Sequence, residues 1–214
     1  MIAQGRVTVN GRAASLGERA AGDADHICVD GKPLARDSDL VYIMLNKPRG
    51  YVSTLRDERG RKTVAELVSD AGARVYPCGR LDLSSEGLLI LTNDGETAYR
   101  LTHPSREVKK TYRVEVSGQD VQAGISRLRG EFYLDGRKLR PAEVSPERLE
   151  HESAVLRVTI GEGRNRQIRR MCAIAGLKVG ALRRIAEGEL KLGGLPPGQW
   201  RYLSEGERRY LRGL

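Results

Sequence analysis

Cysteine and histidine are both scarce in this chain of 214 residues, which contains three of each. Cys28, Cys78 and Cys172 lie far apart, in a spacing that matches neither a zinc knuckle nor a CxxC pair, and their odd number argues against a disulfide framework. The histidines include no pair at metal-ligand spacing. We therefore expect the cysteines to fill the core, and we predict no metal site.

Long apolar runs are also missing. No stretch approaches the roughly 20 residues of a membrane-spanning helix, and the chain does not open with the charged, apolar and small-residue segments of a signal peptide. Hydrophobic residues make up 39% and charged residues 30% of the chain, which is typical of a globular protein. These features predict a cytoplasmic protein with no membrane partner. We also expect a monomer.

Several motifs of common enzyme classes are absent as well. The sequence contains no GxxxxGK phosphate loop, no GxGxxG dinucleotide fingerprint and no GxSxG nucleophile elbow. Nucleotide-binding and catalytic-triad chemistry therefore lack support, and we expect no cofactor.

The positive charge is unevenly distributed. The formal net charge is +9, yet residues 1–40 contain five Lys/Arg against six Asp/Glu, whereas residues 163–186 contain seven Lys/Arg and no acid. A solvated basic face is one explanation. However, six of those seven are arginines, whose planar, forked donors suit phosphate. Nucleic acid is therefore the first partner to consider.

The order of local patterns predicts an α+β fold with a mixed, mostly antiparallel sheet and flanking helices. Apolar alternation and turn pairs predict strands or hairpins around residues 7–13, 27–33, 41–46, 74–78, 87–92, 110–118, 131–144, 154–160 and 177–203. Capping residues and apolar stripes predict helices at 63–68, 96–102, 121–128, from Asn165 to Gly176, and after Ser204. Residues 49–62 suggest a mobile basic loop, and the polar residues 35–39 a domain boundary.

An acid stands on a polar loop between two apolar strands. In the stretch GRLDLSSEG, Asp82 follows Arg80 and precedes Glu86. Taken alone, the loop could be a solvated turn with Asp82 as a cap. Asp82 and Glu86 could also form the carboxylate pair of a glycosidase, although a chain this rich in charge contains many such pairs.

Four motifs in order resemble a known family. GRLDLSSEGLLILTNDG (79–95) resembles the signature of the bacterial ribosomal RNA pseudouridine synthases of the RsuA/RluB type. The family's other motifs resemble LNKPRGYVST (45–54), KTYRVEV (110–116), and EGRNRQIRRM (162–171) followed by LRRIAEGELKLGGLPPGQWRYLSEGE (182–207). The resemblance covers roughly residues 41 to 210.

The resemblance implies a catalytic domain that isomerises a specific uridine in ribosomal RNA to pseudouridine without a cofactor. The motif EGRNRQIRRM favours large-subunit over small-subunit rRNA. A non-catalytic RNA-binding ribosome-assembly factor is the alternative, and such a protein would be expected to lack Asp82 or Tyr112.

The resemblance also implies the roles of individual residues. Asp82 matches the catalytic aspartate, and Arg169 matches the basic residue expected to pair with it and keep it ionised. Tyr112 matches the tyrosine that stacks on the extruded uracil and relays a proton. Arg80 could fill the space left by the flipped nucleotide, and Leu182 matches an apolar residue of the uracil pocket.

Further basic residues are candidates for RNA contacts. Lys47 is expected to be structural or phosphate-binding. General, salt-dependent affinity for phosphate is expected from Arg164, Arg166, Arg170, Arg183 and Arg184.

The N-terminal segment resembles part of a second module. GRVTVNG and DHICVDGKPL, within residues 1–34, resemble the strand half of the small S-four-like RNA-binding module. The two basic helices of that module have no counterpart in this sequence, which puts independent RNA binding in doubt. We therefore predict a partial S-four-like module at 1–38 and a catalytic domain at 39–214.

Overall fold

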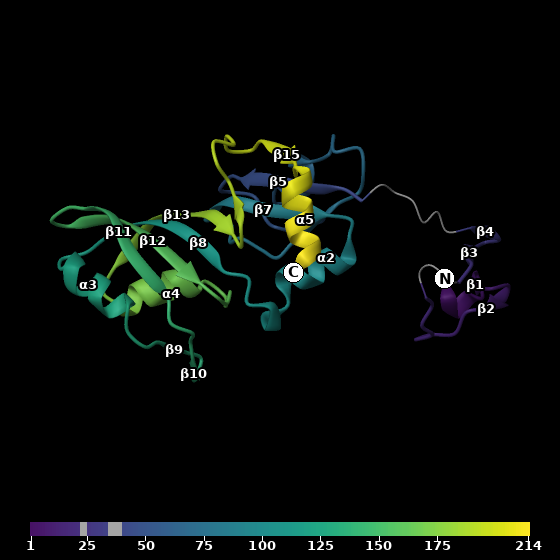
Figure 1. Cartoon of the computed structure of the whole chain (residues 1–214), viewed down its shortest axis with the longest axis horizontal. Helices are drawn as coiled ribbons and strands as arrows, with labels where there is room; N and C mark the ends of the chain where they lie inside the picture. Colours follow the sequence, from purple (N-terminus) through teal and green to yellow (C-terminus); the bar gives the residue numbers. More distant parts are fainter. Residues whose placement is uncertain (22–24, 34–39) are drawn as a thin grey trace. The chain divides into compact units, whose positions relative to one another are not determined.

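The computed structural model describes residues 1–21, 25–33 and 40–214 (Figure 1). The chain divides into two compact units, residues 1–39 and residues 40–214. The predicted domain boundary at residues 38–39 lies outside the described residues.

The first unit is a small antiparallel sheet. Its elements are η1 (Ile2–Gln4), β1 (Val7–Val9), β2 (Arg12–Ala13), β3 (Ile27–Val29) and β4 (Lys32–Pro33), and the strand order is β2-β1-β3-β4. Asn10 and Gly11 join β1 to β2 with φ values of 51° and 80°. Asn and Gly tolerate such positive φ values, which the favoured hairpin turns require. The hairpins predicted around residues 7–13 and 27–33 are therefore confirmed.

The second unit contains a sheet of nine strands with the central order β11-β12-β8-β13-β7-β5-β15, to which β6 and β14 add. The strands are β5 (Tyr42–Lys47), β6 (Tyr76–Cys78), β7 (Glu86–Thr92), β8 (Lys110–Ser117), β11 (Glu143–Leu149), β12 (Ser153–Ile160), β13 (Lys178–Glu187), β14 (Leu190–Lys191) and β15 (Trp200–Tyr202); β9 (Tyr133–Leu134) and β10 (Arg137–Lys138) form a separate hairpin. The helices are α1 (Val64–Leu67), α2 (Gly95–Thr102), η2 (Pro104–Arg106), α3 (Val121–Leu128), α4 (Gln167–Ile174) and α5 (Glu205–Gly213). The β7–β13 pair is parallel and the other named strand pairs are antiparallel, which confirms the predicted α+β class.

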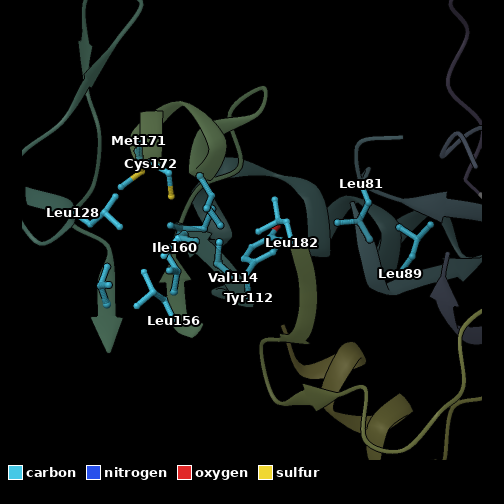
Figure 2. Close-up of a cluster of buried hydrophobic side chains, with 14 of the residues drawn as sticks. Leu81, Leu89, Tyr112, Val114, Leu128, Leu156, Ile160, Met171, Cys172 and Leu182 are labelled. Carbon is cyan, nitrogen blue, oxygen red and sulfur yellow. The ribbon is translucent and has the colours of Figure 1, made fainter. Parts of the chain in front are cut away.

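Two apolar cores lie on the two faces of this sheet. Along β5, Ile43 and Leu45 face a large core with α1, α3 and α4, whereas Tyr42 and Met44 face a smaller core with α2 and α5. This arrangement explains why β5 is apolar at successive positions, since helices cover both of its faces. Figure 2 shows the larger core, in which Tyr112 of β8 lies beside Leu182 of β13.

The two halves of the sheet meet at the short parallel pair of β7 and β13. This pair has two register positions, Arg183 opposite Glu86 and Arg184 opposite Gly87. Gly87 has a φ of 111°, and a Cβ atom there would lie 2.2 Å from the carbonyl oxygen of Arg184. A glycine is therefore required where β7 approaches the Arg184 backbone.

Two local predictions need correction. Helix α4 starts at Gln167 with Arg166 as its N-cap, not Asn165, and Arg166 has the left-handed φ of 50°. Strand β11 was not predicted separately, because most of its residues are polar and exposed and it contains Pro146, which an edge strand tolerates. Among the described residues, no helix has the length and apolar character needed to cross a bilayer.

Candidate active site

The loop that carries Asp82 joins β6 to β7, and its backbone is bonded to the segment that follows β5. Ser53 accepts a hydrogen bond from the Leu81 amide and donates one to the Leu81 carbonyl, both at 3.1 Å. The Gly50 amide donates to the Leu83 carbonyl at 2.8 Å. These bonds use backbone groups of the loop, so its shape does not depend on the Asp82 side chain.

Lys47 provides the central support of this loop. Its ammonium donates to the carbonyls of Pro48, Asp82 and Ser85 at 3.0, 3.2 and 2.9 Å, and the residue is 0% exposed. Of its two expected roles the structural one is found, and the assignment of Lys47 as an RNA contact is corrected, because no surface of the residue reaches solvent. Burial lowers the pKa of Lys47 from 10.5 to about 8, although the charges of Asp82 and Glu86 oppose the shift.

The low pKa of Lys47 predicts a pH-dependent stability. Between pH 8 and 10.5 the unfolded chain keeps a proton on Lys47 that the folded chain has lost, so deprotonation favours the folded state. The free energy of unfolding of the wild type should therefore rise relative to Lys47→Met across this window, by on the order of 3 kcal/mol in total. Urea unfolding of both proteins at several pH values measures the difference, and a flat difference would contradict the low pKa.

Asp82 itself is partly exposed, and Arg166 is its ion-pair partner. The Nη1 atom of Arg166 lies 3.8 Å from Oδ2 of Asp82. The predicted Arg169–Asp82 pair is corrected: Arg169 donates from Nη2 to the Ser84 carbonyl at 3.0 Å. Because α4 begins one residue after Arg166, Arg166 lies at the loop before the helix and Arg169 one turn further on, against the neighbouring loop backbone.

Arg169 is nevertheless close enough to Asp82 and Arg166 for their charges to shift its pKa. Burial lowers the pKa of Arg169, the positive charge of Arg166 lowers it further, and the charge of Asp82 raises it. Arg169 thus holds the Asp82 loop through its backbone and contributes positive potential there.

Asp82 lines a cavity of about 500 Å³, a size typical of small-ligand sites. Tyr112 and Leu182, which are 8% and 5% exposed, line the same cavity from β8 and β13. They are also members of the larger core, in which Figure 2 labels both. The cavity therefore has one apolar wall. Of the predicted site residues, the structure brings together Arg80, Asp82, Tyr112, Arg164, Arg166, Leu182 and Arg184 around this cavity.

The predicted arginines Arg170 and Arg183 do not line the cavity, and Arg164 lines it with its Nε already bonded. Arg170 forms a bidentate pair with Asp135 of the β9–β10 turn at 2.7 and 2.8 Å. Arg183 is half-buried on β13 and is not among the residues that line the cavity. Arg164 reaches the cavity, but its Nε donates to Glu162 at 3.1 Å.

Arg184 is buried and belongs to an internal charge cluster. It is 1% exposed, its Nε donates to the Leu88 carbonyl at 2.7 Å, and its Nη2 lies 3.4 Å from Oε2 of Glu187. Its positive charge opposes the rise that burial causes in the pKa of Tyr112. The prediction that Arg184 belongs to a phosphate-binding surface is therefore corrected: Arg184 is bound inside the sheet, to the backbone of β7 and to Glu187.

Charge compensation explains how this cluster can stay buried. Burial lowers the pKa of Arg184, but the charge of Glu187 and the contact with Tyr112 raise it, and the net shift is upward. Lys110 lies 3.6 Å from Oε1 of the same glutamate. Burial raises the pKa of Tyr112, so its hydroxyl keeps its proton at neutral pH.

Sequence reasoning missed Lys110 and Glu187. Both line the cavity, and Glu187 is 1% exposed. The strand register shifts between Arg184 and Ala186, and this irregularity lets Glu187 face Arg184 although strict alternation would place them on opposite faces. No local sequence signal marks such an irregularity.

Comparison with known proteins identifies the class of this protein as an RNA-modifying enzyme. Residues 41–174 match the family model described as RNA pseudouridylate synthase. The chain is 43% identical over 213 residues to an uncharacterized RNA pseudouridine synthase of Aquifex aeolicus, covering 99% of this chain and 85% of that protein. It is 39% identical over 217 residues to the ribosomal large subunit pseudouridine synthase B of Bacillus subtilis, covering 100% and 88%.

A solved structure agrees with these sequence relatives. The crystal structure of a pseudouridylate synthase superposes with a TM-score of 0.73 at 30% identity, covering 98% of this chain and 90% of that chain. The chain therefore belongs to the RNA pseudouridine synthase family, as its motifs predicted, and is an RsuA/RluB-like member of it.

Proposed function

We propose that this chain isomerises one specific uridine of large-subunit ribosomal RNA to pseudouridine, with Asp82 as the catalytic carboxylate and without a cofactor. The observation that carries the proposal is the place of Asp82, on a loop held by its backbone and at a cavity shared with Tyr112 and Leu182. A target base inside an RNA must leave its stack to reach such a cavity.

The proposed reaction is balanced within the substrate. The bond from ribose carbon 1′ to uracil N1 breaks, the base turns, and a bond forms from carbon 1′ to uracil C5. The proton on C5 is lost and N1 gains one, so the reaction requires no oxidant, hydrolysis or energy source. Asp82 acts as the nucleophile or base while the glycosidic bond breaks.

The surrounding residues would position the base. The ring of Tyr112 stacks on the extruded uracil, and Leu182 supplies the apolar wall beside it. Arg166 orients the Asp82 carboxylate, and Arg80, exposed at the same cavity, occupies the place that the base vacates. Arg169 acts through the loop backbone that it holds.

The Tyr112 role can be tested by two substitutions. Tyr112→Phe keeps the ring and loses the hydroxyl, whereas Tyr112→Leu loses both. If stacking is the main role, Phe should keep RNA affinity and Leu should lose about 1–3 kcal/mol of binding free energy. Equilibrium binding and single-turnover rates measure this, and wild-type activity in both variants would make Tyr112 a core residue alone.

Two observations bear on the competing functions. An assembly factor without catalysis has no need of a supported carboxylate at the edge of a cavity. A glycosidase needs a second carboxylate across the substrate, but Glu86 lies 3.4 Å from Arg49 and is not among the cavity-lining residues. Both alternatives are therefore less well supported than isomerisation.

The choice of large-subunit rRNA is supported by relatives that cover the chain. The Bacillus subtilis protein and a Haemophilus influenzae protein at 38% identity are both named ribosomal large subunit pseudouridine synthase B. We propose that the chain acts in the cytoplasm as a monomer, where ribosomal RNA is exposed during assembly.

Mapping of pseudouridine in rRNA from cells with and without the gene tests the proposal. One large-subunit position should lose its pseudouridine in the deletion strain and regain it when the wild-type gene, but not the Asp82→Asn gene, is returned. Loss of a small-subunit position would overturn the large-subunit assignment, and an unchanged rRNA would contradict ribosomal RNA as the substrate.

We propose that residues 1–38 form a partial S-four-like module that aids selectivity and contributes little electrostatic affinity. In the described part of this unit, Arg6 pairs with Asp30 at 2.6 Å and Arg12 with Glu18 at 3.7 Å. A chain beginning near Ser38 should fold and isomerise a short RNA fragment at a rate comparable with the full chain. Aggregation, or a tenfold loss of fragment affinity, which equals about 1.4 kcal/mol, would contradict this.

A further inference from the structure

A groove of about 750 Å³ leads away from the Asp82 cavity. Arg80, Asp82, Arg164 and Arg166 line both the groove and the cavity, so the two are continuous at the aspartate. The far wall of the groove is formed by residues 52–61, which the family motifs do not cover beyond Thr54.

Residues 53–61, called the arm below, are closed at their base. The Val52 amide donates to the Lys62 carbonyl at 2.9 Å, and the Val64 amide donates to the Val52 carbonyl at 3.0 Å. The arm is therefore a compact loop with adjoining ends. The expectation that residues 49–62 form a loop is confirmed, since this segment contains no helix and no named strand.

Asp57 organises the interior of the arm. Its Oδ2 atom accepts from the amides of Arg59 and Arg61 at 3.1 and 2.9 Å, and its Oδ1 accepts from Nη2 of Arg61 at 2.6 Å. The side-chain bond from Arg61, together with its backbone bond, lowers the pKa of Asp57 to about 2. The Asp57 carboxylate therefore pairs with Arg61 and fixes the backbone next to Arg56 and Arg59.

Arg56 and Arg59 are the arm residues left with free guanidinium groups. Both are exposed, both line the groove, and neither has a side-chain partner within the described part of the chain. Glu58 also lines the groove, while Arg80 adds a further exposed guanidinium next to Asp82. The groove therefore offers more unpaired positive than negative charge along a path that begins at the catalytic carboxylate.

We propose that the arm is a preorganised phosphate-binding wall, in which Arg56 and Arg59 hold the RNA backbone of nucleotides flanking the target uridine. This inference rests on the proposed function. If the target uridine enters the cavity, the RNA backbone on either side of it must run out through an adjoining opening, and the groove is such an opening. Arginine forks suit phosphate oxygens. Asp57 acts as a positioning residue, because its carboxylate is bonded within the arm and fixes the arm's backbone rather than contacting the RNA.

Salt dependence of binding tests the two arginines. The probe is a fluorescein-labelled single-stranded decauridylate, titrated with the full chain by anisotropy between 50 and 400 mM KCl. Each phosphate contact to a single strand contributes about 0.7 to the log–log salt slope. Arg56→Gln with Arg59→Gln should therefore make the slope shallower by about 1.4.

A charge-matched control separates a specific wall from general attraction. Arg74 and Arg209 are exposed, have no partner among the described residues and line neither opening. Arg74→Gln with Arg209→Gln removes the same charge and should leave the slope at the wild-type value. Equal slopes for the two double variants would overturn the proposal.

Asp57→Ala gives a second test. General charge attraction and a preorganised arm predict opposite changes in the affinity for decauridylate. The substitution raises the net charge by one and releases Arg61, so general attraction predicts tighter binding of decauridylate. A preorganised arm predicts weaker binding, because the backbone that presents Arg56 and Arg59 loses its bonds. Tighter binding by a folded Asp57→Ala protein would overturn the role of Asp57.

The binding assay is independent of isomerisation. Suppose that the full chain formed no pseudouridine but that Arg56→Gln with Arg59→Gln made the salt slope shallower as expected. The proposed function would then fail, and the arm would still be an RNA-binding surface. If the variant with Arg56→Gln and Arg59→Gln formed pseudouridine normally and its salt slope stayed at the wild-type value, the arm proposal alone would fail.

Discussion

Asp82→Asn should reduce pseudouridine formation by about a thousandfold or more while leaving the protein folded. The substitution keeps the size of the side chain but removes the negative charge needed by a nucleophile or general base. Lys47 and Ser53 hold the loop through its backbone, so its shape should survive. The partly exposed contact with Arg166 at 3.8 Å should cost at most about 1 kcal/mol of stability.

The rate can be followed by release of isotope from uridine labelled at C5, because the C5–H bond must break. Glu86→Gln is the matched control: it neutralises a carboxylate four residues away that is paired with Arg49 and does not line the cavity. Normal turnover by Asp82→Asn would remove the aspartate from the mechanism. A comparable loss in Glu86→Gln would revive the paired-carboxylate alternative.

Arg184→Met should destabilise the protein by about 3–5 kcal/mol, the range for breaking a buried ion pair. The methionine would fill similar space but leave the Leu88 carbonyl without its donor and Glu187 without its nearer charge. Urea unfolding of the full chain measures the effect on the free energy of unfolding.

Arg183→Gln is the control for this prediction. Arg183 precedes Arg184 on β13 but is half-buried, and loss of its charge should change stability by no more than about 0.5 kcal/mol. If Arg184→Met kept wild-type stability and lost only RNA affinity, the buried-cluster role would be wrong and the surface role predicted from the sequence would return.

The sequence predicted the catalytic fold well because its signals are local. The capping box at Thr63 and Glu66 and the one at Ser204 and Glu207 are both formed, and the Asp135-Gly136 turn joins β9 to β10. Each signal depends on residues a few positions apart, whose bonds form within one turn or hairpin. The order of the family's motifs then identified the enzyme class.

Individual arginines were predicted less reliably. Arg183 and Arg184 are adjacent in a strand, where successive side chains face opposite sides, so they cannot both face the same RNA surface. The sequence did not show which of them is buried. That depends on β7, whose Leu88, 96 residues away in the chain, accepts a hydrogen bond from Arg184 through its carbonyl.

The sequence by itself determined the family and most of the elements, because these depend on short-range patterns and motif order, and on the same basis it predicts Asp82, Tyr112 and Leu182 as site residues. The tertiary structure decided which charges are free. Pairing of Asp82 with Arg166, burial of Lys47 and Arg184, and capture of Arg61 by Asp57 all follow from distances and desolvation. A charged side chain carries the same letter whether it is solvated or paired, and the free energies of the two states differ because packing removes water and sets the distance to the partner.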